Sequence, residues 1–328
     1  MNFTIREKIT EQDMENFFRS CLETAKNTND FHYTSLKERH FEKSEEEIFE
    51  LFKEEIVESF DFDRPDCKIF MLDSEQGEFA GYIWMGIRDS EDVWDFEKPL
   101  WIYDISVQPE FRRGGLGVKL LERAETFAKE LNLNIGLFVH AQNTGAINLY
   151  KKCGYQVKCV PISKYPETRN IPQSAFHVEA HEKISEIESE IQTFGVEKFK
   201  QLVEFTAEST EDRIVERYHE YWQKNFKNDG NHSIFVARDD SDKIAAFVWV
   251  GEASFNERIA MNYDFAVCTD LRQGELEKQL IKIAENWVKK KEFSRYYMLL
   301  HVKHDLSLET CQELGLEAPG YFMEKKLK

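Results

Sequence analysis

The chain repeats itself, and this repeat constrains the fold more than any other feature of the sequence. Ile69-Phe70 recurs as Ile234-Phe235, and Trp84-Met85-Gly86 recurs as Trp249-Val250-Gly251, in both cases 165 residues later. The segment Tyr103–Leu120 aligns without gaps to Tyr263–Leu280, 160 residues later, with seven of eighteen positions identical. We therefore expect two copies of one structural unit, joined near residues 183–190.

The length of the chain agrees with two domains. At roughly 150 residues per domain, 328 residues give about two. We expect the copies to occupy residues 1–184 and 185–328. In the first copy, periodicity predicts a mixed α/β order. The expected helices are 11–25, 45–60, 115–131 and 144–153, and the expected strands are 2–9, 68–72, 79–87, 100–107 and 134–140, followed by a hairpin.

Charge and composition exclude several classes of function. The formal net charge is −18, without a basic run, which argues against a nucleic-acid or anionic-membrane partner. The N-terminal residues carry no apolar signal-like stretch, and no window approaches 18 apolar residues, so we expect a cytoplasmic protein. The six cysteines are scattered, without zinc-like spacing, so we expect reduced thiols and no metal.

The first candidate binding element is the run Arg112-Arg113-Gly114-Gly115-Leu116-Gly117. It lies where a predicted strand gives way to a predicted helix. Exposed N–H groups and the positive end of the helix dipole make such a junction an anion site, and glycines let the backbone approach a pyrophosphate closely. By itself the run is equally compatible with a tight structural turn. A Walker loop and a dinucleotide fingerprint both fit worse.

A second motif follows downstream, in the segment 143–155. The two segments together closely resemble the GNAT superfamily of acyl-CoA-dependent N-acetyltransferases. The family pattern Arg/Gln-x-x-Gly-x-Gly/Ala is met by Arg112, Gly115 and Gly117. The family's second pattern, Asn-x-x-Ala-x-x-Leu-Tyr-x-Lys-x-Gly-Phe/Tyr, is met by Asn143, Ala146, Leu149, Tyr150, Lys152, Gly154 and Tyr155. The resemblance implies that each copy is a mixed, mostly antiparallel sheet flanked by helices.

The resemblance also implies roles for individual residues in binding acetyl-CoA, the acyl donor. The strand Ile105–Val107 would hold the pantetheine arm beside it, in a gap opened by a bulge. Tyr150 would protonate the departing thiolate, or would alternatively be an aromatic residue that caps its helix. Asn143 would anchor the cofactor, cap the helix, or do both. The implied cofactor-binding residues are Ile105, Val107, Arg112, Arg113, Gly114, Gly115, Leu116, Gly117, Val118, Asn143, Ala146 and Tyr150.

The general base is less well defined by the sequence. Many family members carry Glu at the positions that Trp101 and Tyr103 fill here. Asp104 is the nearest carboxylate and is the candidate catalytic residue beside Tyr150. The second copy keeps the equivalent Asp264, and strand alternation from a buried Ile105 could turn Asp104 to the wrong face, so a structural role stays open.

The second copy has lost the glycines of the first. Glu275 and Glu277 stand where the first copy has Gly115 and Gly117, and Cys311 stands for Tyr150. Side chains and negative charge would obstruct a pyrophosphate there. We expect the second copy to keep the fold, to bind no coenzyme A, and to shape the acceptor pocket of the first.

We expect acetyl transfer to a primary amine, and the acidity of the chain favours a small cationic acceptor. Acceptor specificity in relatives resides in loops that correspond here to residues 31–33, 89–97 and 161–172. Two alternatives remain: acetylation of a peptide or protein at its N-terminus or a lysine, and a non-catalytic acyl-CoA-binding module. The oligomeric state is left open.

Overall fold

The computed structural model describes residues 2–28, 31–88, 98–171, 176–183, 185, 187–203, 209–268 and 274–327. These residues form two compact units. Unit 1 contains the described residues up to 157 together with residues 322–327, and unit 2 contains the described residues between 158 and 321. The boundary at 184/185 between the two sequence copies stays a prediction, because the compact units divide the chain at other positions.

Unit 1 is a mixed, mostly antiparallel sheet, as expected. Its strands follow the order β1-β2-β3-β4-β5-β12. The pairs from β1 to β4 are antiparallel, and β4 pairs with β5 in parallel. Its elements are β1 (Phe3–Glu7), α1 (Glu11–Thr28), α2 (Phe31–Arg39), α3 (Glu45–Ser59), β2 (Lys68–Ser74), β3 (Phe79–Ile87), β4 (Leu100–Val107), a 3₁₀ turn (Pro109–Phe111), α4 (Leu116–Glu130), β5 (Ile135–His140), α5 (Thr144–Lys152) and β12 (Gly320–Lys325).

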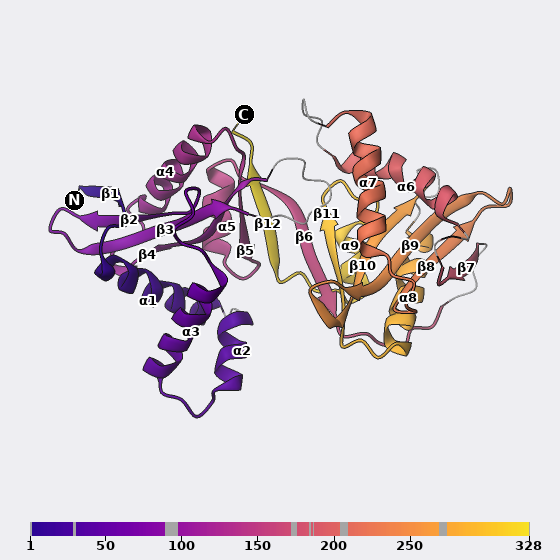
Figure 1. The fold of residues 1–328 in the computed structure, drawn as a ribbon, viewed down its shortest axis with the longest axis horizontal. Helices are drawn as coiled ribbons and strands as arrows, with labels where there is room; N and C mark the ends of the chain where they lie inside the picture. Colours follow the sequence, from indigo (N-terminus) through magenta and orange to yellow (C-terminus); the bar gives the residue numbers. More distant parts are fainter. Residues whose placement is uncertain are drawn as a thin grey trace. The chain divides into compact units, whose positions relative to one another are not determined.

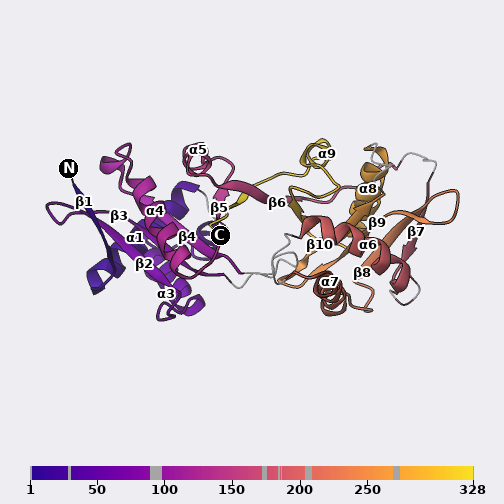
Figure 2. The same ribbon diagram turned by 90° about the horizontal axis from the view of Figure 1, so that it is seen from above.

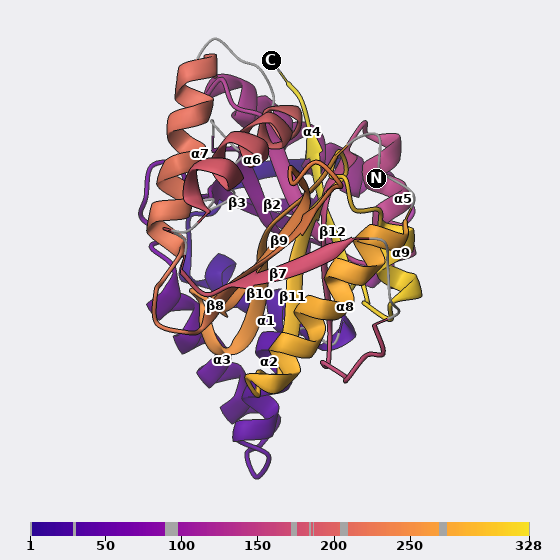
Figure 3. The same ribbon diagram turned by 90° about the vertical axis from the view of Figure 1, so that its right-hand side faces the viewer.

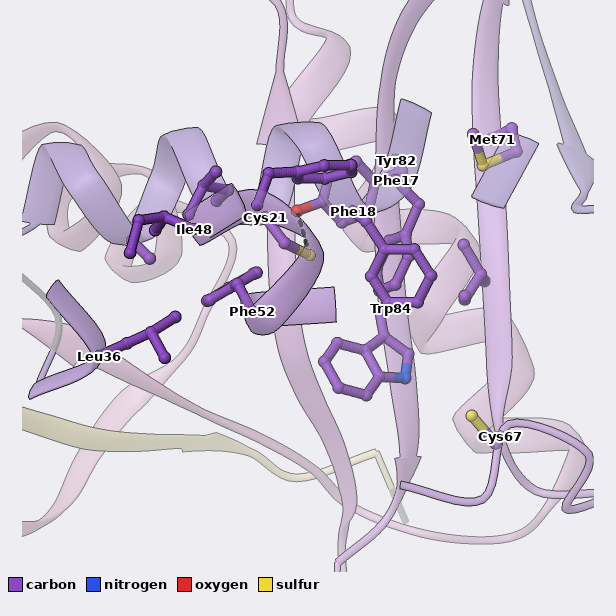
Figure 4. Close-up of a cluster of buried hydrophobic side chains, with 14 residues drawn as sticks. Phe17, Phe18, Cys21, Leu36, Ile48, Phe52, Cys67, Met71, Tyr82 and Trp84 are labelled. Carbon is purple, nitrogen blue, oxygen red and sulfur yellow. Dashed lines mark hydrogen bonds between the residues drawn. The ribbon is translucent and has the colours of Figure 1, made fainter. Parts of the chain in front are cut away.

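Helices cover both faces of this sheet (Figure 1). The helices α1, α2 and α3 bury their apolar faces in one cluster with strand residues such as Met71 and Trp84 (Figure 4). Phe70 alternates with Met71 along β2 and therefore points to the other face. There its ring lies 6.3 Å from that of Phe127 on α4. The helix α3 starts at a capping box formed by Ser44 and Glu47, which satisfies N–H groups at its first turn.

Unit 2 repeats this plan. Its strands follow the order β6-β11-β10-β9-β8-β7, with β10 and β11 parallel and the other described pairs antiparallel. Figures 2 and 3 show α6 and α7 on one face and α8 on the other. Its elements are β6 (Gln156–Lys164), β7 (His177–His181), α6 (Glu188–Leu202), α7 (Glu211–Asn225), β8 (His232–Arg238), β9 (Ile244–Ala253), β10 (Asn256–Val267), α8 (Glu275–Lys290), β11 (Arg295–His301) and α9 (Leu308–Glu313).

The two copies exchange one strand each. The strand that follows α5, β6, pairs antiparallel with β11 of unit 2. The C-terminal strand β12 takes the place next to β5 in unit 1 (Figure 1). The hairpin expected after α5 is therefore wrong: β6 pairs with β11, and β7 pairs with β8. Unit 1 is completed by the last residues of the described chain.

Candidate active site

A gap between β4 and β5 lies at the centre of the candidate site. The two strands pair only from Leu100 to Ile102, opposite Ile135 to Leu137, although both continue further. The register between β3 and β4 shifts between Ile102 and Asp104, which places a bulge at Tyr103. A bulge bends its strand away from regular pairing. The ends of β4 and β5 are therefore free to line a cavity.

A cavity of about 990 Å³ lies along this gap. Its lining includes every residue that the resemblance implies for cofactor binding, except Gly114. The predicted residues that line it are Ile105, Val107, Arg112, Arg113, Gly115, Leu116, Gly117, Val118, Asn143, Ala146 and Tyr150. Segments separated by about forty residues in the sequence therefore meet around one space.

The end of β4 directs a backbone donor into this gap. The N–H of Gln108 donates to the carbonyl of Ala80 on β3 at 2.9 Å. Because successive N–H groups of a strand point to opposite edges, the N–H of Val107 faces the gap. An extended chain lying along β4 would find this donor as an added strand would.

The start of α4 provides further donors. Gly115 caps α4 in the left-handed region, with φ of 77°, and a Cβ there would meet nothing within 4 Å. Arg113 is also left-handed, with φ of 67°. Arg112 donates from Nε to the carbonyl of Val107 at 2.8 Å. The first N–H groups of α4, at Leu116 and the residues after it, are unused within the helix, so this terminus suits a phosphate group.

The helix α5 places Asn143 and Tyr150 at the cavity. Asn143 caps the helix, since its Oδ1 accepts the N–H of Ala146 at 3.1 Å. Tyr150 is buried, and its ring lies 5.9 Å from that of Tyr155. Burial, and then the negative charge of Asp104, raise the pKa of Tyr150 well above its usual value. Its phenol therefore keeps its proton throughout the physiological pH range and can act as a donor.

A second cavity, of about 360 Å³, adjoins the first. Both are lined by Thr24, Thr28, Ile105, His140, Asn143 and Tyr150. The smaller cavity also contains Asp104 and several aromatic residues of α3, β3, β4 and β5. Tyr150 thus lies between the two cavities and lines both.

Asp104 is held by neighbours in unit 1. Its carboxylate accepts the hydroxyl of Tyr82 and the N–H of Ile105, the latter at 2.8 Å. Tyr82 in turn contacts the Sγ of Cys21, 3.1 Å away on α1 (Figure 4). Burial, and then the charge of Asp104, raise the pKa of Tyr82 well above its usual value.

Unit 2 repeats this arrangement around Asp264. The carboxylate of Asp264 accepts the hydroxyl of Tyr218 at 2.6 Å and the N–H of Phe265 at 2.9 Å. The tyrosine comes from a helix in unit 2 and from a strand in unit 1. In both units the carboxylate lies next to the bulge and accepts the N–H of the residue that follows it in the chain.

Among the described residues of unit 2, a cavity of about 40 Å³ lies between β10 and β11. The carboxylate of Asp305 accepts the N–H of Val267, at the register of Val107, at 3.2 Å. Asp305 also lies 3.3 Å from Nζ of Lys198, and the ring of His304 lies 5.7 Å from that of Phe265.

The glutamates of the second copy lie at the start of α8. Glu275 is exposed and 3.9 Å from Lys278, whereas Glu277 is buried. The helix α8 is capped by Gly274, one residue earlier in the repeat register than Gly115. Cys311 is fully buried, and burial raises the pKa of its thiol to about 12. It does not line the small cavity between β10 and β11.

The three loops expected to determine acceptor specificity do not all lie at the cavities of unit 1. His32 lines the smaller cavity of unit 1. Pro161 lies in β6, within unit 2, and lines neither cavity of unit 1. Residues 89–97 and 172 lie outside the described residues. The segment after β6 is anchored by Glu285, which lies 3.0 Å from both Lys164 and Arg169.

Several lining residues have no motif that would have identified them. Trp84 and Phe52 belong to core-like runs, and His140 lies at the end of an expected strand, outside both motifs. Their convergence depends on the packing of α3 on the sheet and on the gap beyond Ile102. In the part of the chain that the structure describes, no helix could span a membrane, and no group of three or more His, Cys, Asp or Glu side chains could hold a metal.

Part of the chain is similar to known acetyltransferases. Residues 29–155 match the model of the acetyltransferase (GNAT) family. GCN5-related N-acetyltransferase 4, chloroplastic, from Arabidopsis thaliana is 29% identical over 128 residues, which cover 35% of this chain and 44% of the relative. N-alpha-acetyltransferase 20 from Dictyostelium discoideum is 41% identical over 98 residues, covering 29% and 54%. The chain thus spans about half the length of these two relatives.

A solved structure resembles the whole fold. The GCN5-related N-acetyltransferase from Sphaerobacter thermophilus has a TM-score of 0.55, is 16% identical, and is covered over 96% of its length by 99% of this chain. At that identity the likeness concerns the fold alone. The family match covers the lining of both cavities of unit 1 except for the residues from α1. Residues 29–155 therefore belong to the acetyltransferase (GNAT) family, and the likeness to the Sphaerobacter structure extends the fold to the rest of the chain.

Proposed function

We propose that this protein is an N-acetyltransferase whose unit 1 moves an acetyl group from acetyl-CoA to a primary amine of a small cationic molecule. The observation that carries the proposal is the pair of adjoining cavities, with Tyr150 lining both. The larger would hold acetyl-CoA and the smaller would hold the amine. The net charge of −18 would favour the approach of a cation.

The larger cavity fits acetyl-CoA in shape and chemistry. Its volume of about 990 Å³ lies at the top of the usual range for small-molecule sites, roughly 300–1,000 Å³. The N–H of Val107 would pair with the pantetheine arm. The start of α4, together with Arg112 and Arg113, would hold the pyrophosphate, since N–H groups and guanidinium groups both bind phosphate oxygens.

The reaction needs one proton transfer to sulfur. The amine nitrogen attacks the thioester carbonyl carbon, a C–N bond forms, and the C–S bond breaks. The thiolate takes the phenolic proton of Tyr150, and the proton lost by the amine restores it through solvent. A phenol whose pKa is raised by burial remains protonated until the more basic thiolate forms beside it.

Asp104 remains a proposal for the general base. Its distance from Tyr150 is short enough for its charge to affect the pKa of that phenol. Its two hydrogen bonds, and their repetition around Asp264 in unit 2, favour a positioning role in which the carboxylate fixes the bulge. The variant Asp104→Asn distinguishes the general-base role from the positioning role. Loss of a general base changes the pH profile of kcat, whereas loss of positioning mainly raises the KM values.

We also propose that one chain binds one acetyl-CoA. In unit 2 the carboxylate of Asp305 already accepts the N–H of Val267, which corresponds to Val107. Isothermal titration calorimetry with acetyl-CoA is expected to give a stoichiometry of one. A stoichiometry of two would refute the proposal for unit 2.

The test of the main proposal is the release of coenzyme A thiol over a panel of amines. Tyr150→Phe is expected to lower kcat at least 100-fold while acetyl-CoA still binds. Tyr155→Phe is the matched control, because Tyr155 is a buried tyrosine nearby that lines neither cavity. Equal activity of Tyr150→Phe and wild type would refute the role of Tyr150.

A second candidate is acetylation of peptides or proteins. The similarity to N-alpha-acetyltransferase 20 over 98 residues favours it. Turnover on peptides but not on free amines in the same panel would establish this second candidate. Binding of acetyl-CoA without turnover on any amine or peptide would instead identify an acyl-CoA-binding module.

A further inference from the structure

We propose that the acceptor is a primary amine with a single positive charge and an aromatic or otherwise apolar body, held in the 360 Å³ cavity of unit 1. The inference rests on the proposed acetyl transfer and narrows the acceptor class. It differs from the expectation of a polyamine or an aminoglycoside. The argument comes from the walls of the cavity, from its charges and from the chemistry of the attack.

Five aromatic side chains form one part of the cavity wall. They are Phe52 from α3, Trp84 from β3, Trp101 and Tyr103 from β4, and Phe138 from β5. Figure 4 shows Phe52 and Trp84 in the cluster beneath α1 and α3. Aromatic walls favour an apolar ligand body and attract one nearby cation through their π faces. This aromatic part of the wall offers few partners to a hydroxyl-rich or multiply charged body, and the polar lining residues, such as Thr28, His140 and Asn143, lie outside this part.

Packing holds these walls in place before any ligand binds. The ring of Tyr103 lies 4.8 Å from that of Trp84 and 4.5 Å from that of Phe60. Trp101 covers Gly136, where a Cβ would come within 2.7 Å of the indole, and its ring also lies 4.4 Å from the guanidinium of Arg88. A preformed site loses little conformational entropy when a ligand binds.

The lining carries one carboxylate, that of Asp104, among the residues that the structure describes. The nearby Glu55 does not line the cavity, and it already pairs with His32 and Arg39 at 2.5 and 2.9 Å. One ammonium group can therefore be balanced by Asp104. Each further ammonium of a polyamine would have to leave water without a carboxylate partner in this lining, which is strongly unfavourable.

The apolar walls also help the amine to react. An amine attacks only as the neutral base, and an apolar environment lowers the pKa of an ammonium group. The cavity would therefore increase the fraction of neutral amine next to the thioester. A polar, multiply charged acceptor would lose this advantage.

The test compares 2-phenylethylamine with spermidine, kanamycin and a short peptide with a free N-terminus. We expect kcat/KM for 2-phenylethylamine to exceed that of each of the others at least tenfold. Trp101→Ala is expected to raise KM for 2-phenylethylamine about tenfold and to leave KM for acetyl-CoA unchanged, and Trp101→Phe is expected to restore most of the loss. Phe255→Ala, an exposed aromatic truncation in unit 2, is the control.

Direct binding distinguishes failure of this inference from failure of the proposed function. Calorimetry with 2-phenylethylamine alone is expected to show binding that Trp101→Ala weakens; no binding would overturn the inference. Preference for spermidine, kanamycin or the peptide would also overturn it and leave acetyl transfer intact. Absence of acetyl-CoA binding and of all turnover would overturn the proposed function, and the amine titration would still decide the chemistry of the cavity.

Discussion

Met323→Ala should destabilise unit 1, although residue 323 lies near the end of the second sequence copy. Met323 is buried in β12, the strand next to β5. Its carbonyl oxygen would lie 3.4 Å from a Cβ at Gly136, near the start of β5. The neighbouring Phe322 places its ring 5.7 Å from that of Trp101. The side chain of residue 323 is therefore expected to be part of the core of unit 1.

The expected size follows from the buried side chain. Truncation of a buried Met to Ala costs about 2–5 kcal/mol, and we take about 3 kcal/mol because the β12 backbone and the 2.7 Å ion pair between Lys325 and Glu125 remain. This corresponds to a roughly 150-fold larger unfolding constant. A domain of ordinary stability, at about 5–15 kcal/mol, would survive the change and stay measurable.

Urea unfolding of the full chain, with and without acetyl-CoA, is the assay. Met323→Ala should weaken the transition that acetyl-CoA stabilises, and it should speed hydrogen exchange in β5. Met298→Ala, on β11 of unit 2, is the matched control and should speed exchange in β10 and β6 instead. If Met323→Ala leaves exchange in β5 unchanged and affects β11 alone, the assignment of β12 to unit 1 is refuted.

Three further predictions concern single groups. Burial raises the pKa of Asp264 to about 6, so its contribution to folding is full below pH 3.8 and is lost as pH rises through 6; the stability of Asp264→Asn relative to wild type should therefore rise by about 3 kcal/mol from pH 4 to pH 7 in urea unfolding, and a constant difference would contradict this. Glu285→Ala leaves the cations of Lys164 and Arg169 without their buried carboxylate and should cost about 3–5 kcal/mol, whereas an unchanged thermal midpoint would count against the ion-pair argument. In Gly115→Ala the new Cβ meets no atom within 4 Å, but the residue must keep φ at 77°. We therefore expect about 1 kcal/mol of destabilisation and a several-fold higher KM for acetyl-CoA. An unchanged KM would show that this turn does not contact acetyl-CoA.

Local signals in the sequence allowed much of the site to be predicted. The glycine run at the start of α4 and the cap at Asn143 depend on backbone conformations that a few adjacent residues determine. The family match confirms the resemblance that these motifs carried. The roles of Tyr150, Asp104 and the cofactor-binding residues stay predictions, although eleven of these residues line one cavity.

The partners of Asp104 were beyond the reach of the sequence. Tyr82 reaches it from β3 in unit 1, and Tyr218 reaches Asp264 from α7 in unit 2. The same carboxylate thus finds the same chemical partner on different elements, and no spacing rule describes both. The aromatic cavity has the same origin, because its walls come from four elements that periodicity marks only as buried.

The sequence by itself determined that this chain contains two copies of one unit, and that glutamates in the second copy replace glycines of the first. Those features are local, so residue order encodes them directly. Only the tertiary structure decided that β12 completes unit 1, that β6 joins unit 2 and that Asp305 accepts the N–H of Val267. The two copies offer equivalent edges to equivalent strands, and the choice between such edges depends on contacts between residues far apart in the chain.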